Sequence, residues 1–378
     1  MKIAVIGTRG FPDIQGGVEK HCEELYTRLV ALGLDVTVIT RAGYVKNKNI
    51  TYYKGVMFAH IFSPKLKSLE AISHTFLAMF KLKKLKPDIV HVHSIGPSLL
   101  IPLIKLFGYK VVMTHHGPDY MRKKWGPFAK LALKKGESNA VKYSDAVICV
   151  GNWIKFYIKK KYGRETYFIP NGIAVSQNIK DAHEYIKGNN DTLKKFGLIP
   201  CKYIITVGRF VPEKAADDLI NAYKLLNNPP FKLVIAGGAD HETPYSLKIK
   251  KLADETPGVV MTGTVYKDVL RDLYINAVLF VLPSHYEGFP ISLLEALILG
   301  VPALVSDIPA HNEIKLSDFR YFKAGNIQGL SSKISQCVDI GMDKNERVRY
   351  LEIIKNDYDW DGIALKTLDV YKTIMKPR

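Results

Sequence analysis

Two carboxylates lie eight residues apart in the segment Glu-Gly-Phe-Pro-Ile-Ser-Leu-Leu-Glu, which runs from Glu287 to Glu295. An apolar, strand-like run at 278–282 precedes this segment, and a helix-like run at 293–299 follows it. A helix N-terminus offers free backbone N–H groups and the positive end of the helix dipole, which favour an anionic ligand. Carboxylates beside it can accept hydrogen bonds from sugar hydroxyls. The spacing therefore indicates a site for a phosphorylated sugar; a capped helix start with incidental acids is the other interpretation.

Cations and glycines follow other strand-like runs of the second half. Arg209 and Lys214 come after the run 203–207 and before a helix-like stretch. Arginine offers a planar fork and lysine a point charge, and both suit a diphosphate, although a solvated pair of cations would look the same. The loop that begins at Gly237 is tight enough to lie against a base or ribose. The loop 307–313 either lines the same site or is structural.

Two loops of the first half have comparable chemistry. Gly16 and Gly17 precede a helix-like stretch and permit close backbone approach to a ligand, although their spacing is not the dinucleotide fingerprint and a flexible loop is the alternative. The second loop reads Thr-His-His-Gly-Pro-Asp and contains His116 and Asp119. A histidine at a strand end can hydrogen-bond a substrate hydroxyl or shield developing charge, so two histidines and an acid in one loop favour a functional role.

These loops are positioned by alternating strand-like and helix-like segments. In the first half we expect strands at 3–6, 36–40, 56–62, 89–93, 111–114, 146–150 and 166–169, and helices at 18–32, 69–85, 128–143 and 152–162. In the second half we expect strands at 203–207, 231–236, 259–262, 278–282, 303–306 and 319–322, and helices at 215–226, 245–253, 269–275 and 290–299. Repeated β-α-β units predict parallel sheets covered by helices on both faces, with ligands at the carboxyl ends of the strands.

The chain is therefore expected to have an α/β fold with two doubly wound, Rossmann-like domains that face each other across a cleft. The expected boundaries are 1–175 and 190–359, because the stretch 174–188 is polar and has no clear period. The last segment, 360–378, is helical and basic, and we expect it to pack back onto the first domain.

The composition is typical of a globular protein, with 47% hydrophobic and 24% charged residues among 378. Four cysteines without paired spacing indicate neither a disulfide framework nor a zinc site. The run 2–7 is too short for a signal peptide, and the longest apolar stretch, 99–107, is too short for a membrane span. We therefore expect a cytoplasmic protein.

Positive charge is concentrated in the first half. Residues 1–171 contain 28 Lys and Arg against 11 Asp and Glu, a formal charge of +17, which leaves +1 of the total +18 for the rest. The lysines alternate with large apolar residues, among them Trp125, Phe128, Trp153 and Phe156. Basic amphipathic helices of this kind suit an anionic membrane surface, although ordinary outer helices with solvated lysines would share the pattern. We expect peripheral attachment to the inner face of the cell membrane.

Several motifs together resemble a known family, the retaining glycosyltransferases of family 4. The motifs occur in order over nearly the whole chain: Gly16-Gly17-Val18-Glu19, His116-Gly117 with Asp119, Pro170-Asn171-Gly172-Ile173, Gly208-Arg209 with Lys214, Glu287-x7-Glu295 and Ser306-Asp307-Ile308-Pro309. The Glu-x7-Glu segment is the most specific. The resemblance implies the type B glycosyltransferase fold and a hexosyltransferase-type reaction with a nucleotide-diphosphate sugar as donor.

The same resemblance implies roles for the candidate residues. The second domain would bind the donor, with Arg209 and Lys214 on the diphosphate and Glu295 on the ribose hydroxyls. Glu287 would lie beside the donor sugar. Donor contacts would also come from Gly237 and from the backbone of Gly288, Phe289, Pro290 and Ile291. His116 would face the donor sugar near the reacting carbon. In the basic first domain, Gly16 and Gly17 would close over donor and acceptor, and Asp119 would bind the acceptor.

No carboxylate stands out as a general base, which agrees with a front-face, retaining mechanism in which the leaving phosphate accepts the acceptor's proton. Cations and a helix dipole would stabilise that phosphate, so we expect no metal and no cofactor. The Asp-x-Asp at 359–361, which overlaps a second one at 357–359, lies near a helix start and is interpreted as a cap. Ala215 departs from the family, which commonly has glycine after the lysine.

We expect the acceptor to be a saccharide or a lipid-linked intermediate of cell-surface polysaccharide synthesis. A sugar-nucleotide epimerase with the same architecture would also need groups that bind a diphosphate. It would not need an acceptor-binding surface that combines basic residues with large apolar ones. A nucleic-acid-binding protein would explain the net charge, but the sequence contains no recognised nucleic-acid motif, so we expect no nucleic-acid partner.

Overall fold

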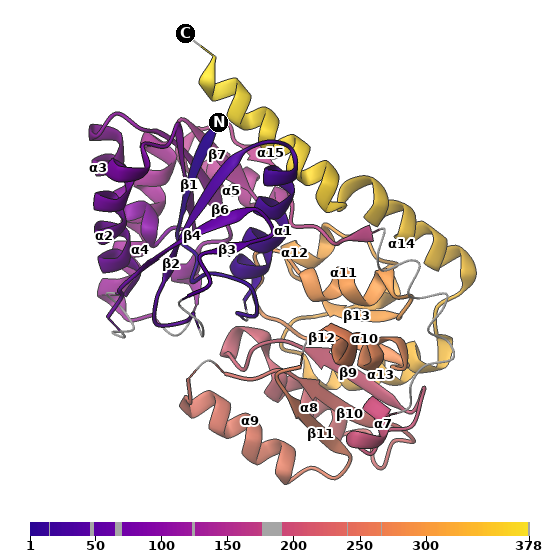
Figure 1. Cartoon of the computed structure of the whole chain (residues 1–378). Coiled ribbons are helices and arrows are strands. Elements are labelled where there is room, and N and C mark those ends of the chain that lie inside the picture. Colours follow the sequence, from indigo (N-terminus) through magenta and orange to yellow (C-terminus); the bar gives the residue numbers. More distant parts are fainter. Residues whose placement is uncertain are drawn as a thin grey trace. The chain divides into compact units, whose positions relative to one another are not determined.

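The computed structural model describes residues 1–14, 16–45, 49–64, 70–122, 125–175, 191–239, 241–265 and 267–376. The chain forms two compact units (Figure 1). Unit 1 comprises Met1–Gly172 together with Trp360–Arg378, and unit 2 comprises Ile173–Asp359. Most of the polar stretch 174–188 lies outside the described residues. No helix among the described residues is both long enough and apolar enough to span a membrane.

The described residues of unit 1 form an eight-stranded sheet with the order β3-β4-β2-β1-β5-β6-β7-β8, in which only β3 is antiparallel to its neighbour. Its strands are β1 (Lys2–Ile6), β2 (Asp35–Arg41), β3 (Tyr52–Tyr53), β4 (Val56–Ile61), β5 (Ile89–His93), β6 (Lys110–His115), β7 (Ala146–Cys149) and β8 (Tyr167–Phe168). Its helices are α1 (Gly17–Ala31), α2 (Glu70–Leu85), α3 (Ile101–Leu106), α4 (Pro127–Tyr143), α5 (Asn152–Tyr162) and α15 (Trp360–Met375).

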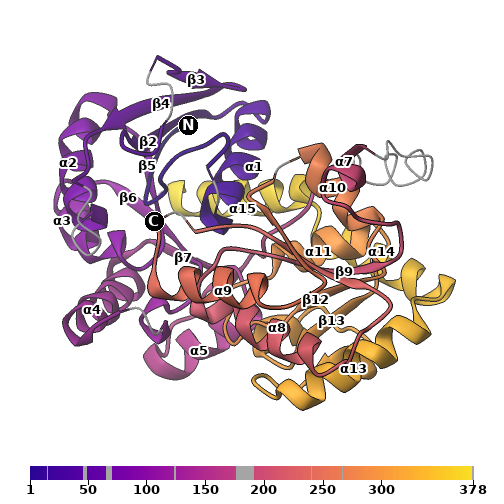
Figure 2. The same ribbon diagram turned by 90° about the horizontal axis from the view of Figure 1, so that it is seen from below.

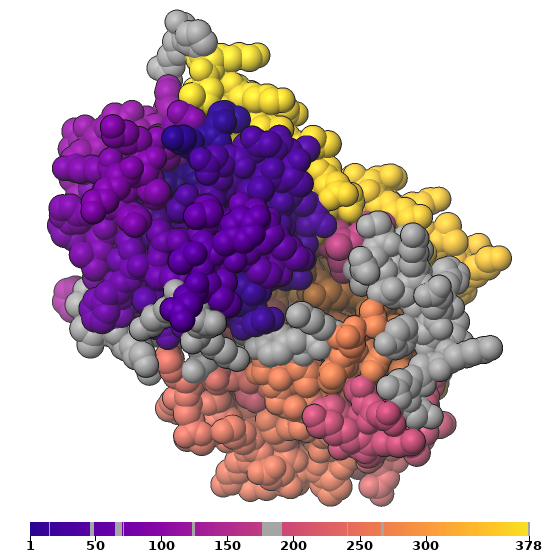
Figure 3. Space-filling view, in the orientation of Figure 1, coloured from indigo at the N-terminus to yellow at the C-terminus, as the bar shows by residue number. Residues whose placement is uncertain are grey.

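One face of this sheet is covered by the first and last helices of the chain. Apolar residues of α1 and α15, including Tyr26, Trp360 and Tyr371, share a core with alternate residues of β1, β2, β5, β6 and β7. The two helices are also joined by an ion pair of 2.6 Å between Arg28 and Asp361. The yellow α15 therefore lies against the indigo start of the chain in Figure 3. Asp361, half of the Asp-x-Asp, is thus held by an arginine.

Unit 2 contains a six-stranded, wholly parallel sheet with the order β11-β10-β9-β12-β13-β14. Its strands are β9 (Tyr203–Val207), β10 (Lys232–Ala236), β11 (Val259–Gly263), β12 (Leu279–Leu282), β13 (Ala303–Ser306) and β14 (Tyr321–Phe322). Its helices are α7 (Asp191–Lys195), α8 (Ala216–Lys224), α9 (Pro244–Asp254), α10 (Lys267–Ile275), α11 (Ile291–Ile298), α12 (Pro309–Asn312), α13 (Ile327–Ile340) and α14 (Lys344–Asp357). Residues of α8, α9 and α13 form the core on one face, and α11 packs with α14 on the other (Figure 2).

The predicted fold class, two parallel-sheet α/β domains, is confirmed. The strands are apolar and nearly continuously buried because helices cover both faces of each sheet, so β-branched runs signalled them well. The prediction missed the short antiparallel edge strand β3 and the helices α3, α7, α12, α13 and α14.

Candidate functional site

Each sheet has a point at which the strand order reverses. In unit 2 the chain starts at β9, continues outward through β10 to β11, and then returns to the other side of β9 with β12. In unit 1 the corresponding neighbours are β1 and β5. Loops that leave such neighbouring strands diverge to opposite faces, and the crevice between them is where doubly wound sheets bind ligands. The loops after β9 and β12 contain Lys214 and Glu287.

Lys214 and Glu287 meet at this point of unit 2. Nζ of Lys214 lies 2.5 Å from Oε1 of Glu287, and the hydroxyl of Ser284 donates a hydrogen bond of 2.8 Å to the same oxygen. Burial raises the pKa of Glu287, but the charge of Lys214 and the hydrogen bonds from Lys214 and Ser284 outweigh burial and hold the pKa below its usual value. The site therefore contains an ionised carboxylate paired with a cation.

The backbone before Lys214 sets its position. A single 3-10 turn, Pro212–Lys214, is followed by Ala215 with φ 51° and ψ 41°, which is the left-handed region. This conformation costs a residue with a Cβ on the order of 1 kcal/mol, which explains why a glycine is favourable at this position. Arg209 lies earlier in the same loop and is partly exposed.

The loop after β10 is locked onto the loop after β9. A Cβ at Gly237, which has φ 147°, would lie 1.8 Å from the carbonyl oxygen of Gly208, so only glycine permits this approach. The amide of Phe210 donates to the carbonyl of Gly238 at 2.8 Å. Beside these loops is a cavity of about 280 Å³, lined among others by Phe210, Gly238, Glu242, Met261 and Thr264.

Glu295 lies in the second turn of α11. Its Oε2 accepts a hydrogen bond of 3.2 Å from the hydroxyl of Tyr274. The N-cap is Pro290, whose side chain has no acceptor for the helix's first N–H groups. The turn before it is anchored by Phe289, which is buried against Tyr358 at 5.4 Å between ring centroids. Gly288 and Ile291 flank this Phe-Pro turn.

A buried histidine, His311, lies close to Glu287. Nδ1 of His311 lies 2.9 Å from the carbonyl oxygen of Ser306 and 3.2 Å from its hydroxyl. The same hydroxyl donates to the carbonyl of Ser284 at 2.5 Å. Burial lowers the pKa of His311 to about 4, although Glu287 opposes this. The loop 307–313 therefore supports the carboxylate with a neutral imidazole, a role that the sequence alone left open.

In unit 1, the turn before α1 is tightly packed. Nε of Arg9 lies 3.0 Å from Oε1 of Glu19, and both side chains are largely buried. A Cβ at Gly16 would lie 2.0 Å from the other carboxylate oxygen of Glu19, whereas the space around Gly17 is open. Gly16 is thus required by this ion pair, and Gly17 is the residue that a ligand can approach.

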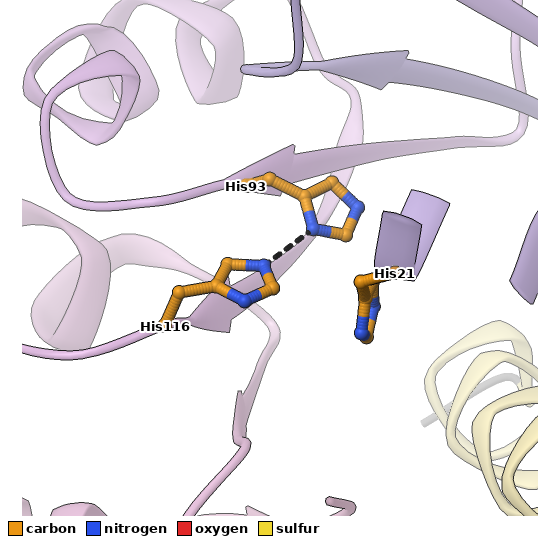
Figure 4. A group of neighbouring side chains, drawn as sticks. All are labelled: His21, His93 and His116. Atoms are coloured by element: carbon orange, nitrogen blue, oxygen red, sulfur yellow. Dashed lines mark hydrogen bonds between the residues drawn. The ribbon is translucent and has the colours of Figure 1, made fainter. Parts of the chain in front are cut away.

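His116 belongs to a cluster with two histidines that the sequence did not single out (Figure 4). Its Nε2 lies 3.0 Å from Nδ1 of His93, and its ring contacts the ring of His21 edge to face at 4.9 Å between centroids. Burial, followed by the neighbouring histidines, lowers the pKa of His116 well below its usual value. The imidazole is therefore neutral near pH 7. Asp119 lies beyond this strand end and forms an ion pair of 3.1 Å with Arg122.

The neighbouring His115 has a different function in the fold. Its Nε2 lies 3.1 Å from Oε1 of Glu137, and both side chains are fully buried. Glu137 also accepts hydrogen bonds from Lys161 at 2.6 Å and from Tyr162 at 2.7 Å. Burial would raise the pKa of Glu137, but these hydrogen bonds, with that of His115 first among them, lower it to about 2. This group ties β6 to α4 and α5.

The candidate residues thus fall into two groups. Unit 2 contains Arg209, Lys214, Gly237, the turn 288–291, Glu287 and Glu295, and unit 1 contains Gly16, Gly17, His116 and Asp119. Their roles remain predictions. His21 and His93 were missed, because each becomes notable only through neighbours that are distant in sequence, and His311 was considered only as part of the loop 307–313. A usable signal was His-Val-His at 91–93, since alternate residues of a strand share a face.

Two family models match the chain. The model described as "Glycosyltransferase Family 4" matches residues 15–177, and the model described as "Glycosyl transferases group 1" matches residues 191–354. The two matched ranges lie on either side of the connecting segment.

Several curated relatives have named activities, and two of them are described here. The UDP-Gal:alpha-D-GlcNAc-diphosphoundecaprenol alpha-1,3-galactosyltransferase of Escherichia coli is 31% identical over 281 residues, which cover 71% of this chain and 70% of that protein. The putative teichuronic acid biosynthesis glycosyltransferase TuaC of Bacillus subtilis is 28% identical over 311 residues, which cover 74% of each chain.

Solved structures share the fold. Sucrose-phosphate synthase from Thermosynechococcus elongatus superposes with a TM-score of 0.81 at 18% identity, covering 99% of this chain and 98% of that one. HepE of Anabaena in complex with UDP-glucose superposes with a TM-score of 0.77 at 16% identity, covering 99% and 100%. At these identities the likeness concerns the fold alone.

Proposed function

Because this chain belongs to family 4 of the glycosyltransferases and has the type B fold, we propose that it is a retaining, metal-independent enzyme that uses a nucleotide-diphosphate sugar. That it is a glycosyltransferase follows from the family. The donor class, the stereochemistry, the absence of a metal requirement and the acceptor are our proposals. The relatives with named activities are transferases, which argues against the epimerase alternative.

The proposal is carried by the pair of Lys214 and Glu287 at the point of unit 2 where the strand order reverses. An ammonium group and a carboxylate at one position can bind the two ends of a sugar diphosphate, the lysine its phosphates and the glutamate the sugar hydroxyls. The N-terminus of α11 adds backbone N–H groups for the phosphates. Arg209, in the loop that holds Lys214, is assigned to the same diphosphate.

We assign the cavity beside Gly237 to the nucleoside of the donor. It has room for a flat base between Phe210 and the glycine loop, with Glu242 and Thr264 as polar partners at its wall. Glu295 lies on the helix that starts at the phosphates and is assigned to the ribose hydroxyls. Neighbours of the same fold are solved with UDP and with UDP-glucose, which supports a nucleotide at a site of this kind.

The proposed chemistry depends on charge stabilisation at the leaving group. The bond from the sugar carbon to the donor phosphate breaks on the face where the acceptor hydroxyl attacks, and the leaving phosphate takes the hydroxyl proton. Lys214, Arg209 and the α11 N-terminus stabilise the negative charge that develops on this phosphate. We assign the neutral His116 to a hydrogen bond with the donor sugar and the open turn at Gly17, with Asp119, to the acceptor.

We propose a lipid-linked saccharide acceptor at the inner face of the cell membrane. The name of the Escherichia coli relative specifies a diphosphoundecaprenol-linked acceptor, and TuaC is named for teichuronic acid biosynthesis. In unit 1, α4 exposes 90% of Phe128 and 66% of Leu131, and α5 exposes 66% of Phe156. Trp125 precedes α4, which begins at Pro127. Lysines on the same helices would bind anionic headgroups.

A thermal-shift screen against nucleoside diphosphates and their sugars tests the donor site, because a ligand that binds only the native state raises the melting temperature. We expect at least one nucleotide-diphosphate sugar to raise it in the wild type and not in Lys214→Ala. A wild-type protein that no such compound stabilises would contradict the proposed donor class.

A further inference from the structure

Three histidines from separate elements of unit 1 direct ring nitrogens at one point. His21 comes from α1, His93 ends β5 and His116 follows β6, and one nitrogen from each lies within 4.8 Å of the others (Figure 4). His21 and His93 are buried, whereas His116 is partly exposed. Imidazole nitrogen is the commonest protein ligand for first-row transition metals.

The nitrogen of His21 is the most informative. Its Nδ1 lies 2.6 Å from Oδ1 of Asn171, an amide oxygen that can only accept, so Nδ1 carries the hydrogen and Nε2 has a bare lone pair. That Nε2 is buried and has no hydrogen-bond partner among the residues that the structure describes. A buried, unpaired acceptor is costly, and a bound cation would satisfy it.

A hydrogen bond also orients the ring of His93 so that one nitrogen can bind a metal ion. Its Nε2 lies 2.5 Å from the hydroxyl of Tyr26, which leaves Nδ1 for the shared point. Hydrogen bonds of this kind, donated by the outer N–H groups of the histidines and accepted here by Asn171 and Tyr26, fix the ring and its tautomer at metal centres. The stacked neighbour His91 is excluded, because Tyr26 and Tyr371 engage its Nδ1 and Thr114 its Nε2.

We propose that His21, His93 and His116 bind one Zn²⁺ or similar divalent transition-metal ion through Nε2, Nδ1 and Nε2 respectively, and that this ion inhibits transfer. Nitrogens bound to one tetrahedral zinc at about 2.0–2.1 Å lie about 3.3 Å apart, close to the 3.0 Å between His93 and His116. His116 would move its hydrogen from Nε2 to Nδ1, so binding needs no net loss of a proton. Solvent beside the partly exposed His116 would supply the fourth ligand.

Inhibition rests on the proposed function, whereas metal binding does not. Metal binding through Nε2 would fix the ring of His116 in the cluster and would prevent this ring from turning toward the donor sugar. The ion would therefore be a competitor for His116 and not a participant in the transfer step. This agrees with the proposed metal independence of catalysis.

Absorption by Co²⁺ tests the site without reference to activity. Titration of the metal-free full chain should produce the visible bands of a four- or five-coordinate Co²⁺ with one equivalent, and Zn²⁺ should abolish them. His21→Phe keeps the ring but removes its nitrogens and should weaken binding by more than 100-fold. His116→Ala, at a partly exposed position, provides a second test if His21→Phe does not fold. Asn171→Ala should weaken binding by about 10–100-fold.

His60→Gln is the matched control, because His60 lies in unit 1 with its imidazole bonded to Thr40 and Ile50. It should bind like the wild type. A folded wild type without these bands, or equal affinity in a folded His21→Phe, overturns the site.

Inhibition is tested by the transfer rate with Zn²⁺ divided by the rate without it. This ratio should be well below one in the wild type and near one in His21→Phe. A rate that rises with Zn²⁺ overturns the inhibitory role. If no donor supports transfer at all, the proposed function fails while the absorption result still stands.

Discussion

Lys214 and Glu287 neutralise each other across the β9–β12 boundary of unit 2, with Nζ and Oε1 2.5 Å apart. Each residue comes from the first loop after its strand, so the parallel register of the sheet, and not proximity in sequence, brings them together. On the proposed assignment, a donor phosphate would compete with Glu287 for the ammonium group, so diphosphate binding would release this carboxylate for the sugar.

Removal of either donor-site charge should slow transfer while the fold survives. We expect Lys214→Ala and Glu295→Ala each to cost on the order of 2–4 kcal/mol of transition-state stabilisation, or about 30- to 900-fold in kcat/KM. Lys248→Ala, which removes a surface lysine paired with Asp217, is the control and should change little. Rates within twofold of wild type for both donor-site variants would refute the assignment.

Chelation should leave the reaction intact. Because lysine, arginine and a helix N-terminus are proposed to stabilise the leaving phosphate, excess EDTA should not lower the transfer rate, and should raise it if the isolated protein carries zinc on its histidine cluster. Loss of activity in EDTA that magnesium or manganese restores would show that the leaving-group chemistry is wrong.

The product should keep the anomeric configuration of the donor. The expectation comes from the Glu-x7-Glu segment and from the absence of a carboxylate suited to be a general base. An NMR spectrum of the purified product reports the configuration directly, and an inverted linkage would contradict the front-face mechanism.

Unit 1 should bind anionic membranes through its basic helices. A basic residue near such a surface contributes roughly 1 kcal/mol, so a few together give reversible attachment. We expect co-sedimentation with anionic vesicles and little with neutral ones. Lys134→Glu with Lys135→Glu on α4 should weaken it and leave donor binding unchanged. Two further lysines shortly before α4, Lys123 and Lys124, lie outside the described residues.

A matched charge reversal is available in unit 2. Lys250 and Lys251 are 53% and 77% exposed on α9, and replacing both by glutamate changes the net charge by the same amount as the α4 variant. If this control releases the protein from vesicles as fully as the α4 variant does, attachment depends on net charge and not on the basic helices α4 and α5 with their exposed apolar residues.

Acid should destabilise unit 1 through Glu137. Its pKa of about 2 lies below the usual 4.5, so its stabilising contribution is present above about pH 4.5 and is lost as the pH falls toward 2. A depression of this size is worth on the order of 3 kcal/mol. Glu137→Gln should therefore be less stable than wild type at pH 7, and the difference in urea midpoint should shrink between pH 4.5 and pH 2.5. A difference that does not vary with pH would exclude this origin.

The sequence predicted the strands well and the site only partly. Parallel strands are buried on both faces, so β9 and β13 were predicted with the observed bounds from their apolar runs alone. Helix α14 was missed because its sequence, KNERVRYLEIIKND, is dominated by charge and has only a narrow apolar stripe. Charged and glycine-rich loops signalled Lys214, Glu287 and His116 individually. The partner of each depends on strand order, which no local pattern encodes.

The return of α15 to unit 1 has a consequence for synthesis of the chain. Trp360, Ile363 and Tyr371 belong to the core of unit 1, yet they are translated after all of unit 2. Unit 1 therefore cannot complete its core on the ribosome until the second unit has emerged, and the hydroxyl of Tyr371 reaches Nδ1 of His91 only then. A released chain truncated after residue 359 should hold a protease-resistant unit 2 beside a first unit that is still readily cleaved.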